Sequence, residues 1–219
     1  MPATVVIPAL NEAERIGGAI DAAFAAGASE VIVADGGSSD GTLSIAQQHG
    51  AKTVTGQRMR ARQLNAGAQA ASHETLIFVH ADTLLPAGAA AAVEEALQHA
   101  RFGGFRVEFL ERTPGLVWTA FAINTRTRLS RCPWGDQAQF IRRETFLASG
   151  GYPEYPLMED YAFAVRMKRD SVLLPLKVRT SGRRFLQKGL VRTTVLNWLI
   201  VIAYRLGVSP ERLARWYRR

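Results

Sequence analysis

Short runs of apolar or β-branched residues alternate with amphipathic stretches along the first hundred residues of the chain. Four of these runs have the length of buried strands, and a segment of helical periodicity follows each of them. Such alternation predicts parallel strands joined by helical crossovers, and therefore an α/β fold. The strands are expected at residues 5–7, 31–33, 52–55 and 76–79, and the helices at residues 11–26, 42–49, 63–71 and 87–100.

The second half is less regular, although strands and helices can still be assigned. A short last helix is expected after the Ser209-Pro210-Glu211 cap, because proline suits the first helical position. We predict one domain over residues 1–185 and a helical, basic and hydrophobic extension over residues 186–219. The other strands are expected at residues 102–109, 137–141 and 172–178, and the other helices at residues 116–129, 143–149, 159–168 and 190–206.

The net charge of +8 is concentrated at the C-terminal end of the chain. Residues 177–219 carry 11 Lys or Arg and only Glu211 as an acid, a net charge of +10, whereas residues 1–176 carry a net charge of −2. A basic tail of this kind suits a nucleic acid, a phosphate-bearing substrate or an anionic membrane face. Charge alone does not distinguish these three partners.

The cysteine content and the N-terminal sequence favour a cytoplasmic protein. Cys132 is the single cysteine and cannot form an intrachain disulfide, so we expect it to be a small buried hydrophobic residue. The sequence Met-Pro-Ala-Thr-Val-Val-Ile-Pro at the N-terminus lacks a basic region, and its apolar run is too short for a signal peptide. We therefore expect a first strand there.

His80 and Asp82 follow directly after the strand expected at residues 76–79. Ligands of open α/β sheets bind at the carboxyl ends of the strands. A carboxylate on such a short, rigid step suits a hard divalent cation that also contacts a substrate phosphate. The alternative from these residues alone is that Asp82 caps the helix that begins near Pro86.

Asp35 ends the second expected strand and precedes Gly36 and Gly37, which let a ligand approach the backbone closely. Its carboxylate could accept hydrogen bonds from a nucleotide base or a ribose hydroxyl. The alternative is a glycine-rich turn in which Asp40 caps the following helix. Taken singly, Asp35 does not decide between a ligand contact and a turn.

Taken together and in this order, six segments resemble the family-2 glycosyltransferases of GT-A fold. The resemblance spans roughly residues 4–170, and its first two segments are specific as a pair. It implies a Rossmann-like, mixed and mainly parallel central sheet flanked by helices. The matching segments are Val6-Ile-Pro-Ala-Leu-Asn-Glu12, Val33-Ala-Asp35-Gly-Gly-Ser-Ser-Asp-Gly-Thr42, Gln63-Leu-Asn65-Ala-Gly67, Phe78-Val-His-Ala-Asp82, Gly150-Gly-Tyr152 and Met158-Glu-Asp160.

The resemblance implies a nucleotide-diphospho-sugar donor, which we expect to be a UDP-sugar. Residues at the strand ends would contact the base and ribose. Three arginines near a helix start would suit the diphosphate, since guanidinium groups match phosphate oxygens, unless they are only solvated surface residues. The expected nucleotide-binding residues are Pro8, Asn11, Glu12, Asp35, Arg62 and His80, with Arg58 and Arg60 beside Arg62.

The resemblance also implies a metal and a general base. Asp82 matches the last carboxylate of the family's Asp-x-Asp motif and would hold Mn²⁺ or Mg²⁺. His80 replaces the first carboxylate, which leaves open whether the imidazole ligates the metal, because Mg²⁺ prefers oxygen. Asp160 matches the base that deprotonates the acceptor hydroxyl, with Glu159 or Asp136 as the next candidates. Direct displacement by that hydroxyl inverts the anomeric carbon.

The C-terminal extension has several open interpretations. Arg183 and Arg184 follow an extended segment where the family often places a basic loop over the diphosphate, so they are candidates for donor phosphates or a phosphorylated acceptor. The apolar run over residues 195–204 is about half of the ~20 residues that a membrane span requires. With Arg192 and Arg205 near its ends, this run could lie in a membrane interface, pack against its own domain, or pair with a second copy as a homodimer.

The expected partners are the nucleotide-sugar donor and an acceptor hydroxyl or phosphate, for which a lipid-linked compound is one candidate. Residues 190–219 could contact the inner face of the membrane peripherally, and no nucleic acid is expected.

Two alternative functions have different sequence requirements. A sugar-nucleotidyltransferase would carry a glycine-rich, basic phosphate loop after the first strand, where this chain has Pro8-Ala-Leu-Asn11. A non-catalytic membrane-binding or nucleic-acid-binding module has no use for Asp35, Asp82 and Asp160 near a polyanion. A structure with these three carboxylates far apart would favour such a module.

Overall fold

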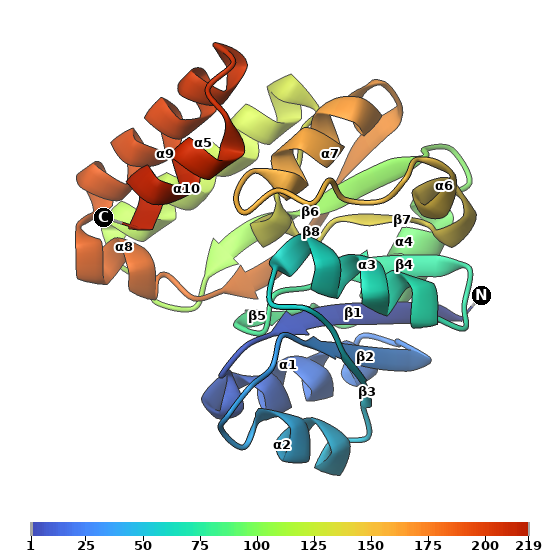
Figure 1. The fold of residues 1–219 in the computed structure, drawn as a ribbon. Coiled ribbons are helices and arrows are strands. Elements are labelled where there is room, and N and C mark those ends of the chain that lie inside the picture. The colour runs from blue at the N-terminus through green and yellow to red at the C-terminus, as the bar shows by residue number, and fades with distance from the viewer. Residues whose placement is uncertain (1, 219) are drawn as a thin grey trace.

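An eight-stranded curled sheet forms the centre of the computed structural model, which describes residues 2–218 (Figure 1). The strand order is β3-β2-β1-β4-β7-β6-β8-β5, and helices cover both faces, which confirms the predicted α/β fold with a mixed, mainly parallel sheet. The strands are β1 (Ala3–Ala9), β2 (Glu30–Asp35), β3 (Lys52–Thr55), β4 (Thr75–Phe78), β5 (Thr83–Leu84), β6 (Phe102–Phe109), β7 (Phe140–Arg142) and β8 (Ser171–Thr180).

The first four strands form a parallel half in which β1 pairs with both β2 and β4, and β2 also pairs with β3. Successive side chains of a strand point to opposite faces, so Val5 and Ile7 enter one hydrophobic core and Val6 enters the other. Every residue of β2 is buried, because helices cover both of its faces. The carboxyl ends of β1, β2 and β4 therefore meet at one edge of the sheet.

The second half adds antiparallel pairing. β7 is antiparallel to both β4 and β6, whereas β8 runs parallel to β6. After β4 the chain enters β5, a two-residue strand that the sequence did not predict and that pairs with β8 at the far end of the strand order. His80 and Asp82 lie on the step between β4 and β5. The backbone N–H of Ser181 donates to the Asp82 carbonyl at 3.2 Å, so the step lies beside the end of β8.

Two helical layers enclose the sheet. The core on one face contains residues from α1 (Ala13–Ala25), α2 (Thr42–Gln48), α4 (Ala89–Ala96) and α5 (Pro114–Ser130). The core on the other face contains residues from α3 (Arg60–Ala70), α6 (Arg143–Ala148), α7 (Glu159–Met167), α9 (Leu190–Arg205) and α10 (Pro210–Arg218). A short helix α8 (Arg183–Lys188) and two 3-10 turns, η1 (Gly135–Gln137) and η2 (Lys168–Asp170), complete the elements.

Three local expectations differ from the structure. The strand expected over residues 137–141 begins only at Phe140, because η1 and the left-handed backbone of Ala138 (φ 47°) interrupt the extended chain. Helix α3 begins at Arg60 rather than residue 63, so Arg60 and Arg62 are helical. Arg183 and Arg184 begin α8 and do not lie in an open loop.

The C-terminal helices pack against the domain that precedes them. Ile200 and Val201 of α9 and Leu213 of α10 are buried in the same core as α3 and α7. Over residues 2–218, no helix combines the length and the apolar composition needed to cross a membrane. The domain boundary at residue 185 stays a prediction.

Glu30 is a buried carboxylate that joins β2 to neighbouring segments. It accepts hydrogen bonds from Thr4 Oγ1 at 2.6 Å, from Ser72 N and Oγ at 2.9 Å each, and from the Lys52 ammonium. Burial alone would raise the pKa of Glu30, but these donors outweigh it and lower the pKa to about 2. The ionised form is therefore the one that stabilises the fold.

We expect Glu30→Gln to lower the free energy of unfolding at pH 7 by about 1–3 kcal/mol, because it removes a charge that several donors surround. The folded-state pKa of about 2 lies below the ordinary value of 4.5, so this stabilisation is complete above pH 4.5 and is lost as the pH falls toward 2. Denaturant unfolding of both proteins at several pH values measures the difference. Glu14→Gln, whose side chain is 83% exposed, is the matched control. Equal stabilities of Glu30→Gln and wild type at pH 7 would contradict the assignment.

Candidate active site

Two loops at the carboxyl ends of β1 and β2 are bonded to each other. Asn11 has a left-handed backbone (φ 56°); its N–H donates to Ser38 Oγ at 2.9 Å, and its Oδ1 accepts the Ser39 N–H at 2.9 Å. The Glu12 N–H donates to Thr42 Oγ1 at 2.9 Å. These hydrogen bonds hold the two loops together as one continuous surface. The loops belong to the two segments that the sequence resemblance assigns to the nucleotide.

Asp35 is fully buried at the end of β2 and shapes its own loop. Its Oδ2 accepts the N–H groups of Gly37 at 2.8 Å and Ser38 at 2.9 Å, and its Oδ1 accepts the Ser38 hydroxyl. Asp40 Oδ1 accepts the Thr42 N–H at 3.0 Å at the start of α2. The turn that was the alternative for this segment is therefore present. A nucleotide contact of Asp35 stays a prediction, and it would use the remaining lone pair of Oδ1.

Gln63 of α3 bridges the ends of β1 and β2, a role that its motif did not reveal. Its buried Nε2 donates to the carbonyl oxygens of Ala9 at 2.7 Å and Ala34 at 2.9 Å. A Cβ at Gly36 would lie 3.1 Å from the Gln63 amide, which explains the glycine at that position. The motif Gln63-Leu-Asn65 singles out this residue in the sequence. Only the structure shows that its amide hydrogen-bonds the carbonyl oxygens of two strand ends.

A chain of side-chain hydrogen bonds leads from α3 to α7. Asn65 accepts the Tyr152 N–H and donates to the Tyr152 carbonyl, each at 2.9 Å. The Tyr152 hydroxyl donates to Gln139 Oε1 at 2.7 Å, and Gln139 Nε2 donates to the Asp160 carbonyl at 3.1 Å. The motif segments at Asn65 and Tyr152 thus position the backbone at Asp160.

Asp160 and His80 both pack closely against Gly135. The Gly135 N–H donates to Asp160 Oδ2 at 2.7 Å, and the Tyr161 N–H donates to Asp160 Oδ1 at 2.7 Å. A Cβ at Gly135 would lie 2.8 Å from Asp160 Oδ2 and 3.0 Å from His80 Nε2. The missing side chain of Gly135 therefore lets the Asp160 carboxylate and the His80 imidazole both approach its backbone closely.

The imidazole of His80 is neutral at neutral pH. Burial and the charge of Arg60 lower the pKa of His80 to about 4, and the carboxylates Asp82 and Asp160 offset this only in part. A neutral ring offers one donor and one acceptor nitrogen. His80 is thus suited to hydrogen bonding with an uncharged ligand group.

Arg60 and Arg62 are paired with carboxylates from the second half of the chain. Arg60 Nε contacts Glu159 Oε1, whose charge raises the pKa of Arg60, and Arg62 contacts Glu154 at 2.8 Å. Glu159 is 1% exposed and is occupied by this ion pair. Of the three arginines expected near the diphosphate, Arg58 forms no ion pair among the described residues.

Asp136 and Arg126 contribute two unsatisfied polar atoms near Asp160. Asp136 lies on η1, where burial raises its pKa, and its Oδ1 has no hydrogen-bond partner among residues 2–218. Arg126 Nε has none either, while its guanidinium lies 3.6 Å above the Trp134 ring and donates to Gln137 Oε1 at 3.1 Å. The sequence offered Asp136 only as a reserve base, because nothing in Gly135-Asp-Gln137 shows that its carboxylate lacks a partner.

Arg183 and Arg184 lie next to the step that carries Asp82, since the neighbouring Ser181 N–H bonds the Asp82 carbonyl. Arg184 stacks on the Tyr217 ring at 3.7 Å and also donates to the Tyr217 hydroxyl. The Arg183 side chain is exposed. The structure thus brings Asp82, His80, Asp160 and the start of α8 together.

The donor set around Asp82 fits a cation that is shared with a ligand. No cluster of three or more His, Cys, Asp or Glu side chains among residues 2–218 is arranged to hold a metal ion. Asp82 supplies one carboxylate and His80 one neutral nitrogen. Mg²⁺ and similar ions are commonly held by one or two carboxylates together with substrate phosphates. Asp82 would therefore hold a metal mainly when a diphosphate supplies the remaining oxygens.

The fold and site place this chain in the GT-A class of α/β proteins. The features are the parallel strands, the hydrogen-bonded loops after β1 and β2, and the connection after β4 that carries Asp82. Within this class, residues 4–152 match the family described as Glycosyl transferase family 2. This match covers more than half of the chain, which therefore belongs to that family of sugar-transferring enzymes. A comparison with curated proteins finds no match.

Solved structures of similar fold bind nucleotides. S. aureus TarS 1-349 in complex with UDP is 15% identical with a TM-score of 0.66, and the alignment covers 83% of this chain and 60% of that one. Glucosyl-3-phosphoglycerate synthase from Mycobacterium tuberculosis, in complex with Mn²⁺, UDP and glucosyl-3-phosphoglycerate, is 20% identical with a TM-score of 0.63 and coverage of 94% and 80%. The chain thus spans about 60% of the TarS fragment. At these identities the likeness establishes the fold.

We expect Gly135→Ala to slow sugar transfer by roughly 10- to 100-fold, because the added Cβ would push the Asp160 carboxylate away from its position. Gly18→Ala on α1 is the control, since a Cβ there meets nothing within 4 Å. Transfer rates and melting curves of both variants are the measurements. A Gly135→Ala enzyme with the wild-type rate would mean that the close packing of Asp160 and His80 against Gly135 is not needed for the reaction.

Proposed function

We propose that the chain is an inverting glycosyltransferase that moves a sugar from a nucleotide-diphospho-sugar, a UDP-sugar, to an acceptor hydroxyl or phosphate. The observation that carries the proposal is the close approach of Asp160 and His80 to Gly135, with Asp82 two residues after His80. Family membership and the UDP bound to similar structures support the same conclusion.

The donor would bind along the edge formed by β1, β2 and β4. Its base and ribose would contact the bonded loops through Pro8, Asn11, Glu12 and Asp35, and neutral His80 would hydrogen-bond an uncharged hydroxyl. A divalent metal, Mn²⁺ or Mg²⁺, would be held by Asp82 and would stabilise the negative charge of the departing diphosphate. Arg62, Arg183 and Arg184 are the candidate phosphate or acceptor contacts.

Asp160 is the proposed general base. Each carboxylate oxygen accepts one backbone N–H, from Gly135 and from Tyr161, which orients the group and leaves lone pairs for an acceptor proton. As that proton moves to Asp160, the acceptor oxygen attacks the anomeric carbon, and the nucleoside diphosphate leaves with the electrons of the broken bond. Glu159 is held by Arg60, which supports Asp160 over its neighbour.

The positions of the carboxylates argue against the alternative functions. Asp35 and the step carrying Asp82 lie after β2 and β4, which flank β1, and Asp160 and His80 both pack against Gly135. A non-catalytic module would gain nothing from this grouping of charge. A sugar-nucleotidyltransferase would need a basic phosphate loop after β1, where the backbone instead bonds the β2 loop.

Asp160→Asn should keep nucleotide-sugar affinity near wild type while transfer falls by about 10²–10⁴-fold, as is typical for loss of a general base. The amide keeps one acceptor oxygen, so one of the two backbone bonds survives. Donor binding by calorimetry and transfer under saturating substrates with chemistry rate-limiting measure the two effects. A melting curve excludes misfolding. Wild-type transfer in this variant would remove Asp160 from the mechanism and direct attention to Asp136.

Asp82→Asn should weaken UDP binding in the presence of Mn²⁺ and leave binding in the presence of a chelator almost unchanged, because Asp82 already holds the cation before the reaction. Titrations of UDP with and without Mn²⁺ provide the measurement. Asp21→Asn, on the exposed face of α1, is the control for a change of one charge. If Asp82→Asn retained the full metal-dependent affinity, Asp82 would not be a metal ligand.

A further inference from the structure

The outer face of α9 is an apolar stripe that runs the length of the helix. Most of its exposed residues lie three or four positions apart, with Leu199 adjacent to Trp198, so they lie on one side of the helix. Trp198, in the middle of this stripe, is 53% exposed. The stripe consists of Val191, Val195, Trp198, Leu199 and Ile202, and Leu206 continues it directly after the helix ends. Exposed apolar surface of this extent and order marks an interaction site.

Helix α5 carries a second exposed apolar group. Val117, Trp118 and Phe121 are each exposed by more than half, and the rings of Trp118 and Phe121 lie 5.5 Å apart. The two helices meet where Leu190 of α9 packs against Gly115, since a Cβ at Gly115 would lie 2.8 Å from Leu190 Cδ1. Figure 1 shows α5, α8, α9 and α10 gathered at one end of the molecule.

Basic residues outnumber acidic ones around these apolar groups. Helices α5, α8 and α9, all fully described, contain no aspartate or glutamate, whereas each contains arginine. A groove of about 450 Å³ borders the α5 group, and basic residues line it together with Val117 and Phe121. These basic residues are Arg106, Arg112, Arg128 and Lys177, accompanied by Glu108 and Glu111.

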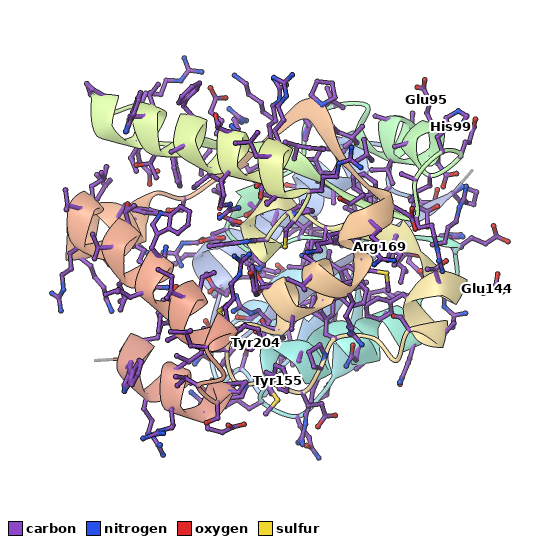
Figure 2. The ribbon with its side chains drawn as sticks, turned by 90° about the horizontal axis from the view of Figure 1, so that it is seen from above. Glu95, His99, Glu144, Tyr155, Arg169 and Tyr204 are labelled. Carbon is purple, nitrogen blue, oxygen red and sulfur yellow. The ribbon has the colours of Figure 1, made fainter. Side chains whose placement is uncertain are left out.

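The inner face of α9 is already occupied by its own domain. Ile200 and Val201 are buried, and Tyr204 lies near Tyr155 of the segment before α7, as Figure 2 shows. Rotation of α9 to bury the outer stripe would therefore expose the core contacts of its inner face. The stripe needs a partner from outside this domain.

We propose that the outer faces of α9 and α5 bind the surface of an anionic phospholipid bilayer. Tryptophan, leucine and isoleucine would enter the interfacial region, and the surrounding arginines and lysines would contact lipid phosphates. A second copy of the chain is the poorer partner. A two-fold contact through these faces would bring like charges together without carboxylates on the three helices to neutralise them.

The test is flotation of the full chain with phosphatidylcholine vesicles that contain or lack phosphatidylglycerol. Wild type should bind the anionic vesicles at least about tenfold more tightly than the neutral ones, and this preference should fall as salt is added. Two double variants, Trp198→Glu with Ile202→Glu and Trp118→Glu with Phe121→Glu, should each lose about tenfold or more of the binding to anionic vesicles.

The matched control is Leu147→Glu with Val165→Glu, which changes two exposed apolar residues of α6 and α7 to the same acid and should bind like wild type. Melting curves establish that all four proteins are folded. Absence of binding to anionic vesicles, or equal binding by the control and both double variants, would overturn the proposal. Equal binding of wild type to neutral and anionic vesicles would overturn its electrostatic part. Sedimentation velocity without vesicles tests for a second copy of the chain as the partner. A second copy would replace the bilayer in the proposal if wild type self-associated, Trp198→Glu with Ile202→Glu abolished that self-association, and no vesicle binding were found.

Discussion

The ion pair between Arg60 and Glu159 links the two halves of the molecule at the site, in addition to the pairing of β4 with β7 and the core they share. These residues are 99 positions apart and lie at the N-terminal ends of α3 and α7. A carboxylate that is 1% exposed needs a partner, because an unpaired charge at such a site costs several kcal/mol. Helix α7 is therefore held against α3 through its first residue. The next residue is Asp160, so its carboxylate lies at a fixed position relative to the first half of the chain.

Carboxylates near the site fall into two groups according to the donors that surround them. Asp35 and Asp160 each accept two backbone N–H groups, which hold their orientation without a ligand. Asp136 has an oxygen without a partner among the described residues, although that atom is buried. A buried polar atom without a hydrogen bond destabilises the fold. This oxygen of Asp136 therefore favours a ligand group that forms the missing hydrogen bond. Around Gly135, the preorganised carboxylate of Asp160 thus lies near the incomplete one of Asp136.

Much of the fold could be predicted because strands and helices follow from local patterns. Alternation over the first hundred residues predicted the parallel half, and the motif order predicted the GT-A arrangement. β5 escaped prediction because two residues carry no pattern and its pairing with β8 is long-range. The late start of β7 depends on the left-handed backbone of Ala138, a conformation that alanine rarely adopts.

The sequence selected candidate site residues, whose roles stay predictions, and it revealed few of their contacts. Asp82 and Asp160 could be selected because their motifs fix their places at strand and helix ends. Gln63 and Gly135 could not be assigned roles, since one bridges two carbonyl oxygens and the other acts by lacking a side chain. Arg60 suited a phosphate in the sequence, but its partner Glu159 is distant in the chain and only tertiary packing brings them together.

Helix α9 connects the proposed bilayer contact to the proposed base. Its Arg205 donates to the Tyr161 hydroxyl at 2.7 Å, and the rings of Tyr204 and Tyr161 are 5.8 Å apart. Tyr161 directly follows Asp160 and donates its N–H to that carboxylate. A bilayer on the outer stripe would therefore lie one helix diameter, about 10 Å, from Tyr161, which holds the Asp160 carboxylate. An acceptor carried at a membrane surface could approach Asp160 over this short distance. If the acceptor instead diffused freely in water, the apolar stripe would have no role in transfer.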